Sequence, residues 1–394
     1  MFGKAGLVAL GALAMLAGTP AMAQQQTVKV GIIAPFSGVD GGFGRTMRAA
    51  VETYVAQHGD TVDGKKVEFI YRDSGGVNPG LVKQLAQELI LKDKVSYLGG
   101  FNYSPNALAV APIIQQSKTP TVLFNAATSA ITAKSDYFVR TANTLWQVYV
   151  PLANWAYGEG MRKAVTAVAD FSPGYDADES FTKTFEKLGG KVVDHLRMPL
   201  STTDFAPFVQ RIKDSGADAV VVFLVAGPSS IAFIKAYRDN GLPQAGIKYM
   251  GMGETDETNL QQMGDAALGI ITTYHYSEAH DSAMNREFVK KYAEISKGED
   301  TNFVAVGAYD GTRVLYEMIK AAGAEGGAKA VEAVKGMKWE SPRGPVEIDP
   351  KTRHVTQNVY IRRVEKGPDG KLINKEFKTY EAQPDWGLVS DAAK

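Results

Sequence analysis

Polar residues follow two apolar runs in the stretch from Tyr97 to Thr132. The first run ends in a turn that contains Asn102, Tyr103 and Ser104, and the Ser104-Pro105 pair favours the start of a helix. The second run ends in the sequence Asn125-Ala126-Ala127-Thr128. A helix N-terminus offers free N–H groups and the positive end of the helix dipole, which attract an anion. The residue types therefore predict a carboxylate-binding site, although each turn could instead be an ordinary strand-to-helix connection.

A glycine-rich turn at 35–44 follows the apolar run at 28–34. It does not fit the dinucleotide-binding fingerprint, because Met47 stands where the last glycine should be, and the Lys-Ser/Thr pair of a phosphate loop is missing. We expect the glycines to let the backbone approach a small ligand, with Phe43 as an apolar wall. Alternatively, Phe43 is a loop aromatic that packs on its own turn.

Two further turns carry candidate ligand contacts. Tyr175 ends the turn at 170–175 and, with Tyr103, could supply aromatic surface to a mostly apolar pocket. Glu254 lies in a glycine-rich turn at the end of a predicted strand. It could face an ammonium or hydroxyl group of a ligand, or it could be an exposed loop acid.

Composition and motifs argue against several other classes of function. The chain has no cysteine, and this excludes thiolate catalysis and Cys-ligated zinc. Its five histidines fall in no metal-binding spacing, and neither HExxH nor the GxSxG elbow occurs. Lys+Arg and Asp+Glu both number 43, so nothing favours nucleic-acid binding. We expect a binding protein that is not an enzyme and needs no cofactor or metal.

Strand and helix patterns alternate along two successive parts of the chain. The first part has apolar strand patterns at 28–34, 66–72, 95–98, 121–124 and 136–140. The second restarts near residue 144, with strand patterns at 163–169, 192–198, 218–225, 247–250 and 269–274. Such alternation predicts parallel sheets with helices on both faces. Three helical patterns between 282 and 335 have no sheet of their own and should cover the first one, and two final strands are expected at 357–364 and 375–380.

The first 23 residues have the pattern of a signal peptide. Lys4 precedes an uncharged apolar run at 5–18, which is too short for a comfortable membrane span. Ala21-Met22-Ala23 is a small-x-small cleavage site, so the mature chain should begin at Gln24. No cysteine follows to carry a lipid anchor. We therefore expect an exported, periplasmic protein.

Several spaced motifs resemble the branched-chain-amino-acid type of periplasmic binding protein, which feeds solutes to ABC transporters. The motifs are Val30 to Gly38, Ala126 to Thr128, Asp204-Phe205, Tyr309-Asp310 and Ser341 to Pro345, and the likeness extends from about Val28 to Val364. It implies an α/β, type I periplasmic binding fold with two doubly wound parallel-sheet lobes and a three-crossover hinge. Lobe I would comprise 24–143 and 276–340, and lobe II 144–275 and 341–394. A monomer that delivers its ligand to an inner-membrane permease and ATPase is implied.

The resemblance also places the ligand. Its carboxylate would lie on the Tyr103-Ser104 turn and on Ala126 to Thr128, with Phe43 lining the cleft and Tyr175 offered by the second lobe. Amino-acid binders often have an aromatic residue near Ala226-Gly227, and their acid for the α-ammonium group falls on Gly253 or Glu254.

The small residues at Ala226-Gly227 leave room for a flat ring, and the chain resembles the branch that binds benzoate-like carboxylates. The predicted ligand is therefore a benzoate, hydroxybenzoate or phenylpropenoid. A branched-chain or other aliphatic amino acid is the alternative, as is a periplasmic sensor role.

Overall fold

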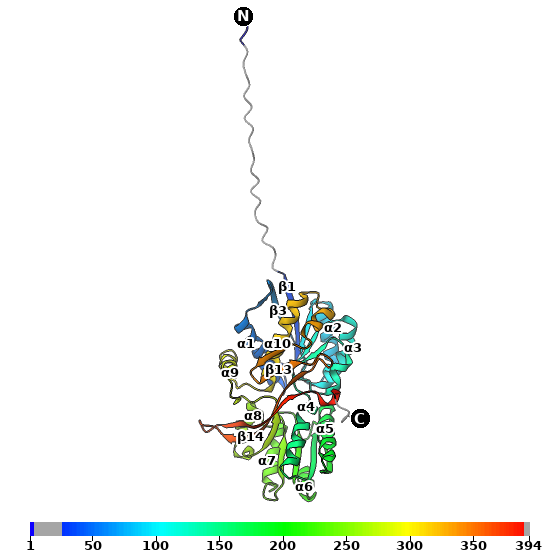
Figure 1. The fold of residues 1–394 in the computed structure, drawn as a ribbon, viewed down its shortest axis with the longest axis vertical. Coiled ribbons are helices and arrows are strands. Elements are labelled where there is room, and N and C mark those ends of the chain that lie inside the picture. The colour runs from blue at the N-terminus through cyan, green and yellow to red at the C-terminus, as the bar shows by residue number, and fades with distance from the viewer. Residues whose placement is uncertain (4–25, 390–394) are drawn as a thin grey trace.

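Two β-sheets form the centres of two lobes, which lie one above the other in Figure 1. The computed structural model describes residues 1–3 and 26–389. The first sheet has the strand order β2-β3-β1-β4-β5-β6, and all its neighbouring strands are parallel except the pair β2–β3. Its strands are β1 (Thr27–Ala34), β2 (Thr61–Val62), β3 (Lys65–Asp73), β4 (Tyr97–Gly100), β5 (Thr121–Leu123) and β6 (Phe138–Arg140).

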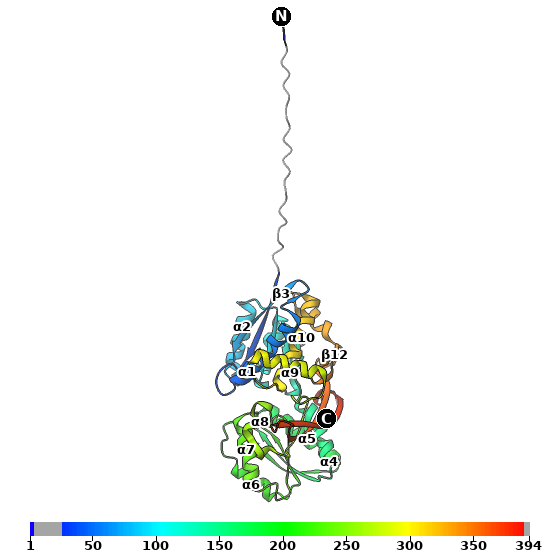
Figure 2. The ribbon, with the colours of Figure 1, turned by 90° about the vertical axis from the view of Figure 1, so that its left-hand side faces the viewer.

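Helices from two distant parts of the chain cover this first sheet. The early helical segments are α1 (Gly41–His58), α2 (Pro79–Leu91), α3 (Ser104–Ser117) and the short η1 (Ser129–Lys134). The late ones are α9 (Ala283–Ser296), α10 (Phe303–Ala322) and α11 (Gly327–Val334). As the sequence pattern predicts, the late helices return to the first lobe, where α9 and α10 pack against α1 (Figure 2).

The second sheet combines a parallel part with an antiparallel extension. The parallel strands are β7 (Lys163–Ala169), β8 (Lys191–Met198), β9 (Ala219–Phe223), β10 (Lys248–Gly251) and β11 (Ile271–Tyr274). The antiparallel strands are β12 (Lys338–Ser341), β13 (Gly344–Ile348), β14 (Val355–Lys366) and β15 (Leu372–Gln383). The helical segments are α4 (Leu145–Gly158), α5 (Ser172–Lys187), α6 (Ala206–Asp214), α7 (Pro228–Asp239), α8 (Glu257–Met263), η2 (Gly264–Ala267) and α12 (Trp386–Val389).

The segment at 339–346 differs from its sequence-based prediction. We expect a loop there because it is rich in turn residues, but it forms a tight hairpin in which Ser341 pairs with Gly344. The two turn residues between them are Pro342 and Arg343, and Gly344 has a positive φ of 96°. The turn-forming residues therefore make a short connection between β12 and β13, and these two strands extend the second sheet.

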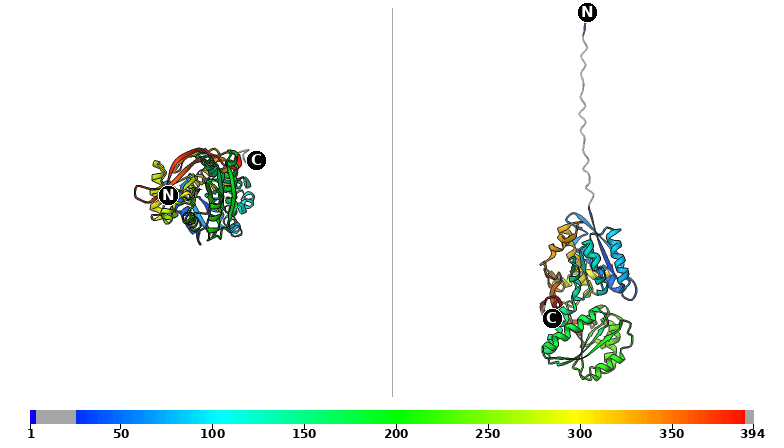
Figure 3. Two further views of the ribbon diagram at one scale, coloured as in Figure 1. Left: turned by 90° about the horizontal axis from the view of Figure 1, so that it is seen from below. Right: turned by 90° about the vertical axis from the view of Figure 1, so that its right-hand side faces the viewer.

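The chain passes between the lobes after β6, after β11 and again along β12 to β14 (Figure 3), and the last described helix, α12, contacts α4 of the second lobe and η1 of the first. Arg140, at the end of β6, is fully buried there and pairs with Asp385 at 3.1 Å. A second buried pair joins Arg343 to Asp310 of α10 at 2.7 Å. These two buried arginines of the hinge are thus paired with carboxylates, which offsets the cost of burying their charge.

Within the described part of the chain, none of the helices is long and apolar enough to cross a lipid bilayer. The predicted signal peptide falls almost wholly on residues 4–25, outside the described residues, and so remains a prediction.

Candidate ligand-binding site

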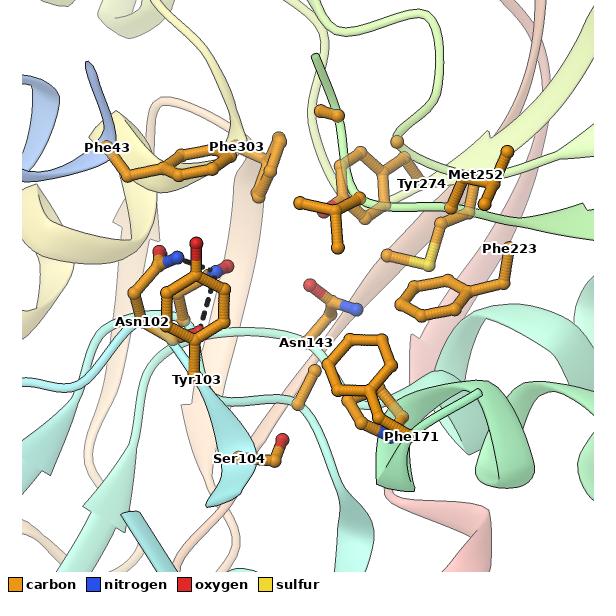
Figure 4. Close-up of a pocket in the computed structure, with 17 residues that line it drawn as sticks. Phe43, Asn102, Tyr103, Ser104, Asn143, Phe171, Phe223, Met252, Tyr274 and Phe303 are labelled. Atoms are coloured by element: carbon orange, nitrogen blue, oxygen red, sulfur yellow. Dashed lines mark hydrogen bonds between the residues drawn. The ribbon is translucent and has the colours of Figure 1, made fainter. Parts of the chain in front are cut away.

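A cavity of about 70 Å³ lies where the carboxyl ends of strands from both lobes face each other (Figure 4). The first lobe lines it with the turns after β4 and β5 and with the beginnings of α1 and α10. The second lobe lines it with the residues that end or follow β7, β9, β10 and β11. About 10–15 Å³ suffices for one water molecule, so this inner cavity admits a ligand of several atoms.

A wider cavity of about 660 Å³ adjoins the inner one. The two share Phe43 and Tyr103 of the first lobe and Phe171 of the second. The wider space also contacts charged side chains, among them Asp40 and Arg45. The cleft between the lobes therefore has a narrow inner part and a broader, more polar outer part.

Ser104 and Ala127 form a donor-rich end of the inner cavity. Ser104 begins α3, and its Oγ accepts the N–H of Thr128 at 3.1 Å, while its own O–H donates to no acceptor in the described part of the chain. The backbone N–H groups of Ser104 and Ala127 make no hydrogen bond within the described residues. Together with the positive end of the α3 dipole, these donors can hold a carboxylate.

The two polar turns are joined to each other beside these donors. The side-chain nitrogen Nδ2 of Asn125 donates two hydrogen bonds to Asn102, one to the backbone carbonyl oxygen at 3.2 Å and one to the side-chain oxygen at 2.9 Å (Figure 4). Tyr103 is only 6% exposed, and its hydroxyl has no partner of good hydrogen-bond geometry in the described residues. Burial raises the pKa of this hydroxyl well above its ordinary value, and the Asp40 carboxylate raises it further. The Tyr103 hydroxyl thus stays protonated at neutral pH.

Aromatic rings from both lobes form the rest of the wall. Phe171 and Phe223 stack with ring centroids 6.0 Å apart and an interplanar angle of 28°. Phe303, the first residue of α10, lies 5.0 Å from the Tyr274 ring and 6.4 Å from the Phe43 ring, measured between centroids. Figure 4 shows these rings around the cavity together with Met252. Such a wall suits a flat apolar group.

The structure brings seven of the twelve predicted contact residues to the inner cavity: Phe43, Asn102, Tyr103, Ser104, Asn125, Ala127 and Ala226. Gly227 lines only the wider cavity. Ala126 and Thr128 are buried beside the inner cavity, where their carbonyl oxygens accept hydrogen bonds from Arg140 at 3.1 and 2.7 Å. These two residues therefore fix the second turn from behind.

Tyr175 and Glu254 do not line either cavity. Tyr175 is 46% exposed, and its hydroxyl donates to Asp170 at 2.8 Å. Glu254 is fully buried and accepts the N–H groups of Leu224 at 2.9 Å and Met252 at 2.5 Å. Burial raises the pKa of Glu254 to about 7. Glu254 thus joins the ends of β9 and β10, is not an exposed loop acid, and lies outside the lining of both cavities.

Sequence reasoning missed most of the aromatic wall, including Phe171, Phe223 and Tyr274. Phe223 and Tyr274 end strands β9 and β11, so their position at the carboxyl edge of the predicted sheet was an available signal. Phe303 gave no such signal, because only the return of α10 to the first lobe brings it there. Asn143 and Met252 also line the cavity without having been predicted.

The inner cavity is electrically neutral along its wall. Among the described residues that line it, none has a charged side chain. Nor does any group of three or more His, Asp or Glu residues in the described part of the chain have an arrangement suited to a metal ion. A ligand anion would therefore be held by hydrogen-bond donors and the helix dipole.

Two hinged α/β lobes with a small neutral cavity between their sheet edges define a protein that binds a small ligand by enclosing it. Residues 27–370 match the family described as periplasmic binding protein, and the chain belongs to that family. The predicted type I fold is confirmed.

Individual relatives cover nearly the whole chain. A solute-binding protein of an ABC transporter from Rhodopseudomonas palustris HaA2, solved in complex with p-hydroxybenzoic acid, is 51% identical with a TM-score of 0.89, over 92% of this chain and 100% of that one. A solute-binding protein from strain BisB5, in complex with 3,4-dihydroxybenzoic acid, is 44% identical with a TM-score of 0.87, over 92% and 99%. The Leu/Ile/Val-binding protein homolog 6 of Brucella melitensis is 48% identical, over 97% and 98%.

Proposed function

We propose that this chain is the solute-binding component of an ABC importer and that it closes its lobes around a small aromatic carboxylate of the benzoate or hydroxybenzoate type. The observation that carries this proposal is the composition of the inner cavity. Free donors at Ser104 and Ala127 suit a carboxylate, and aromatic rings suit a flat ring. The titles of the two Rhodopseudomonas palustris structures support the same class of ligand.

The alternative ligand is a branched-chain or other aliphatic amino acid, which the name of the Brucella melitensis relative supports. Such a ligand carries an ammonium group, and burying it without an acidic partner is unfavourable. Glu254, the acid considered for that role, accepts two backbone N–H groups below the cavity wall instead. The neutral wall therefore favours the aromatic acid.

The same proposal covers the cellular setting. We infer that the chain is exported through residues 1–23, acts in the periplasm without catalysis or a cofactor, and docks as a monomer on an inner-membrane permease and ATPase. We also propose that the chain crosses from one lobe to the other near residues 143, 275 and 340. Membership of the periplasmic binding protein family supports these inferences.

Thermal unfolding with a ligand panel tests the class of ligand. The mature chain would be melted with benzoate, 4-hydroxybenzoate, leucine and valine. A ligand at 100 times its Kd adds about 2.7 kcal/mol of stability, which a melt detects. We expect a shift with the aromatic acids only, and a shift with leucine or valine alone would contradict the proposal.

A substitution tests where the carboxylate lies. Ser104→Ala removes one donor to a charged group, so binding of benzoate should weaken by about 1.5–3 kcal/mol in calorimetry. Ser117→Ala, at the other end of the same helix, is the matched control and should leave the affinity unchanged. Unchanged affinity in the Ser104 variant would show that the carboxylate does not lie at the start of α3.

A further inference from the structure

Tyr274 places an unused hydroxyl group at the inner cavity. It is the last residue of β11, lines the cavity and is only 2% exposed. Its hydroxyl makes no hydrogen bond within the described residues. In the same lobe, the hydroxyls of Tyr237 and Tyr149 donate to the carbonyl oxygens of Ile247 and Val222, whereas the hydroxyl of Tyr249 also lacks a partner in the described part of the chain but lies away from the cavity. Because Tyr274 lines the cavity, a ligand group can become the hydrogen-bond partner of this unpaired hydroxyl.

The Tyr274 ring is held firmly from several sides. Its centroid lies 5.0 Å from that of Phe303 and 4.7 Å from that of His275. The Arg362 guanidinium lies over the ring, 5.1 Å from the centroid. Arg362 is itself fixed, because it donates to the carbonyl oxygens of Tyr276 at 2.6 Å and Met252 at 2.9 Å. The direction of the Tyr274 hydroxyl is therefore set before a ligand arrives, and this lowers the entropic cost of binding.

Tyr274 and the donor-rich end lie on opposite sides of the cavity. Figure 4 shows Ser104 on one side and Tyr274 across from it, with Asn143 and the aromatic rings between. A benzoate whose carboxylate lies at Ser104 directs its para position away from that end. Burial keeps the pKa of the Tyr274 hydroxyl well above its ordinary value, so the group can donate or accept a hydrogen bond at neutral pH.

We propose that the Tyr274 hydroxyl recognises a ring hydroxyl opposite the ligand carboxylate, so that the site selects para-hydroxylated benzoates over benzoate itself. This assignment rests on the proposed function and narrows its ligand class. A site built to hydrogen-bond a ligand hydroxyl discriminates against the analogue that lacks it, because the buried partner is then left unpaired.

The experiment is a cycle of two ligands and two proteins. Calorimetry would give the Kd values of 4-hydroxybenzoate and benzoate for the mature chain and for Tyr274→Phe. We expect the unaltered chain to bind 4-hydroxybenzoate about tenfold more tightly than benzoate. Tyr274→Phe should lose about tenfold in affinity for 4-hydroxybenzoate and less than about twofold for benzoate, since only the first ligand loses a hydrogen bond.

Tyr249→Phe is the matched control. Tyr249 is 3% exposed and its hydroxyl also lacks a partner within the described residues, but it does not line the cavity, so both affinities should stay unchanged. Equal losses for both ligands in Tyr274→Phe would show that the residue acts by packing, and a loss for benzoate alone would place the carboxylate at Tyr274. Either result, or no change at all, overturns the assignment. Failure of the unaltered chain to bind either acid would instead overturn the proposed function.

Discussion

Asp176 is a partly buried carboxyl group on α5 that joins the two lobes. Its Oδ2 accepts the N–H of Ser129 in the first lobe at 2.8 Å. Arg140 is near, but it already pairs with Asp385, whose charge also acts on Asp176. Burial is the main cause that raises the pKa of Asp176, from 3.8 to about 7. The protonation of this one group should therefore influence stability near neutral pH.

The sign follows from the direction of the shift. The folded state holds the proton of Asp176 more tightly than the unfolded state does, so stability falls as the pH rises toward and beyond 7. A carboxyl group with a pKa of about 7 when folded and about 3.8 when unfolded contributes about 1.4 kcal/mol at pH 6 but only about 0.1 kcal/mol at pH 8. Because Asp176 keeps some exposure to water, we expect a difference of about 1 kcal/mol between these two pH values.

Urea unfolding of the chain and of Asp176→Asn at pH 6 and pH 8 measures this contribution. Asparagine can still accept the Ser129 N–H but does not titrate. The free energy of unfolding of the unaltered chain, relative to the variant, should be about 1 kcal/mol higher at pH 6 than at pH 8. His275 and His354, whose pKa values burial lowers, are present in both proteins, so their effects cancel.

Glu186→Gln, an exposed change on the same helix, is the control, and its difference from the unaltered chain should be the same at pH 6 and pH 8. The reasoning would be refuted if the chain and Asp176→Asn differed by the same amount at both pH values, within about 0.3 kcal/mol. That result would mean that Asp176 stays ionised in the folded protein and that its pKa is not raised.

Two further predictions concern stability and can be measured by urea unfolding at one pH. Asp385→Ala leaves the buried Arg140 without its partner and should cost about 3–5 kcal/mol, whereas Glu365→Ala removes only exposed ion pairs and should cost less than about 1 kcal/mol. Gly307→Ala would place a Cβ against the backbone carbonyl oxygen of Phe124, just after β5, and should lower the free energy of unfolding by about 1–3 kcal/mol. Its control, Gly158→Ala, places the Cβ in open space at the end of α4 and should leave stability unchanged or raise it slightly. Equal effects within either pair would contradict the packing described here.

Local features of the chain were predictable because they depend on near neighbours in the sequence. The apolar runs and turn residues predict the alternation of strands and helices, and Ser104-Pro105 marks the start of α3 to within two residues, although Tyr103 and not Ser104 is the N-cap. The carboxyl ends of parallel strands meet at one edge of a sheet, so the polar turns after β4 and β5 could be placed together at the cavity. The hairpin of β12 and β13 was missed, since its pairing depends on the rest of the second sheet.

Which side chains face the ligand cavity was decided by the tertiary structure. Glu254 and Tyr175 both lie in turns at the correct sheet edge, but Glu254 turns back to the N–H groups of Leu224 and Met252, and Tyr175 turns outward to Asp170. Phe303 joins the wall only because α10 packs on the first lobe. The sequence alone determines where strands end and which residues lie there. The direction of each side chain depends on hydrogen-bond partners and packing from distant segments, which only the folded chain brings together.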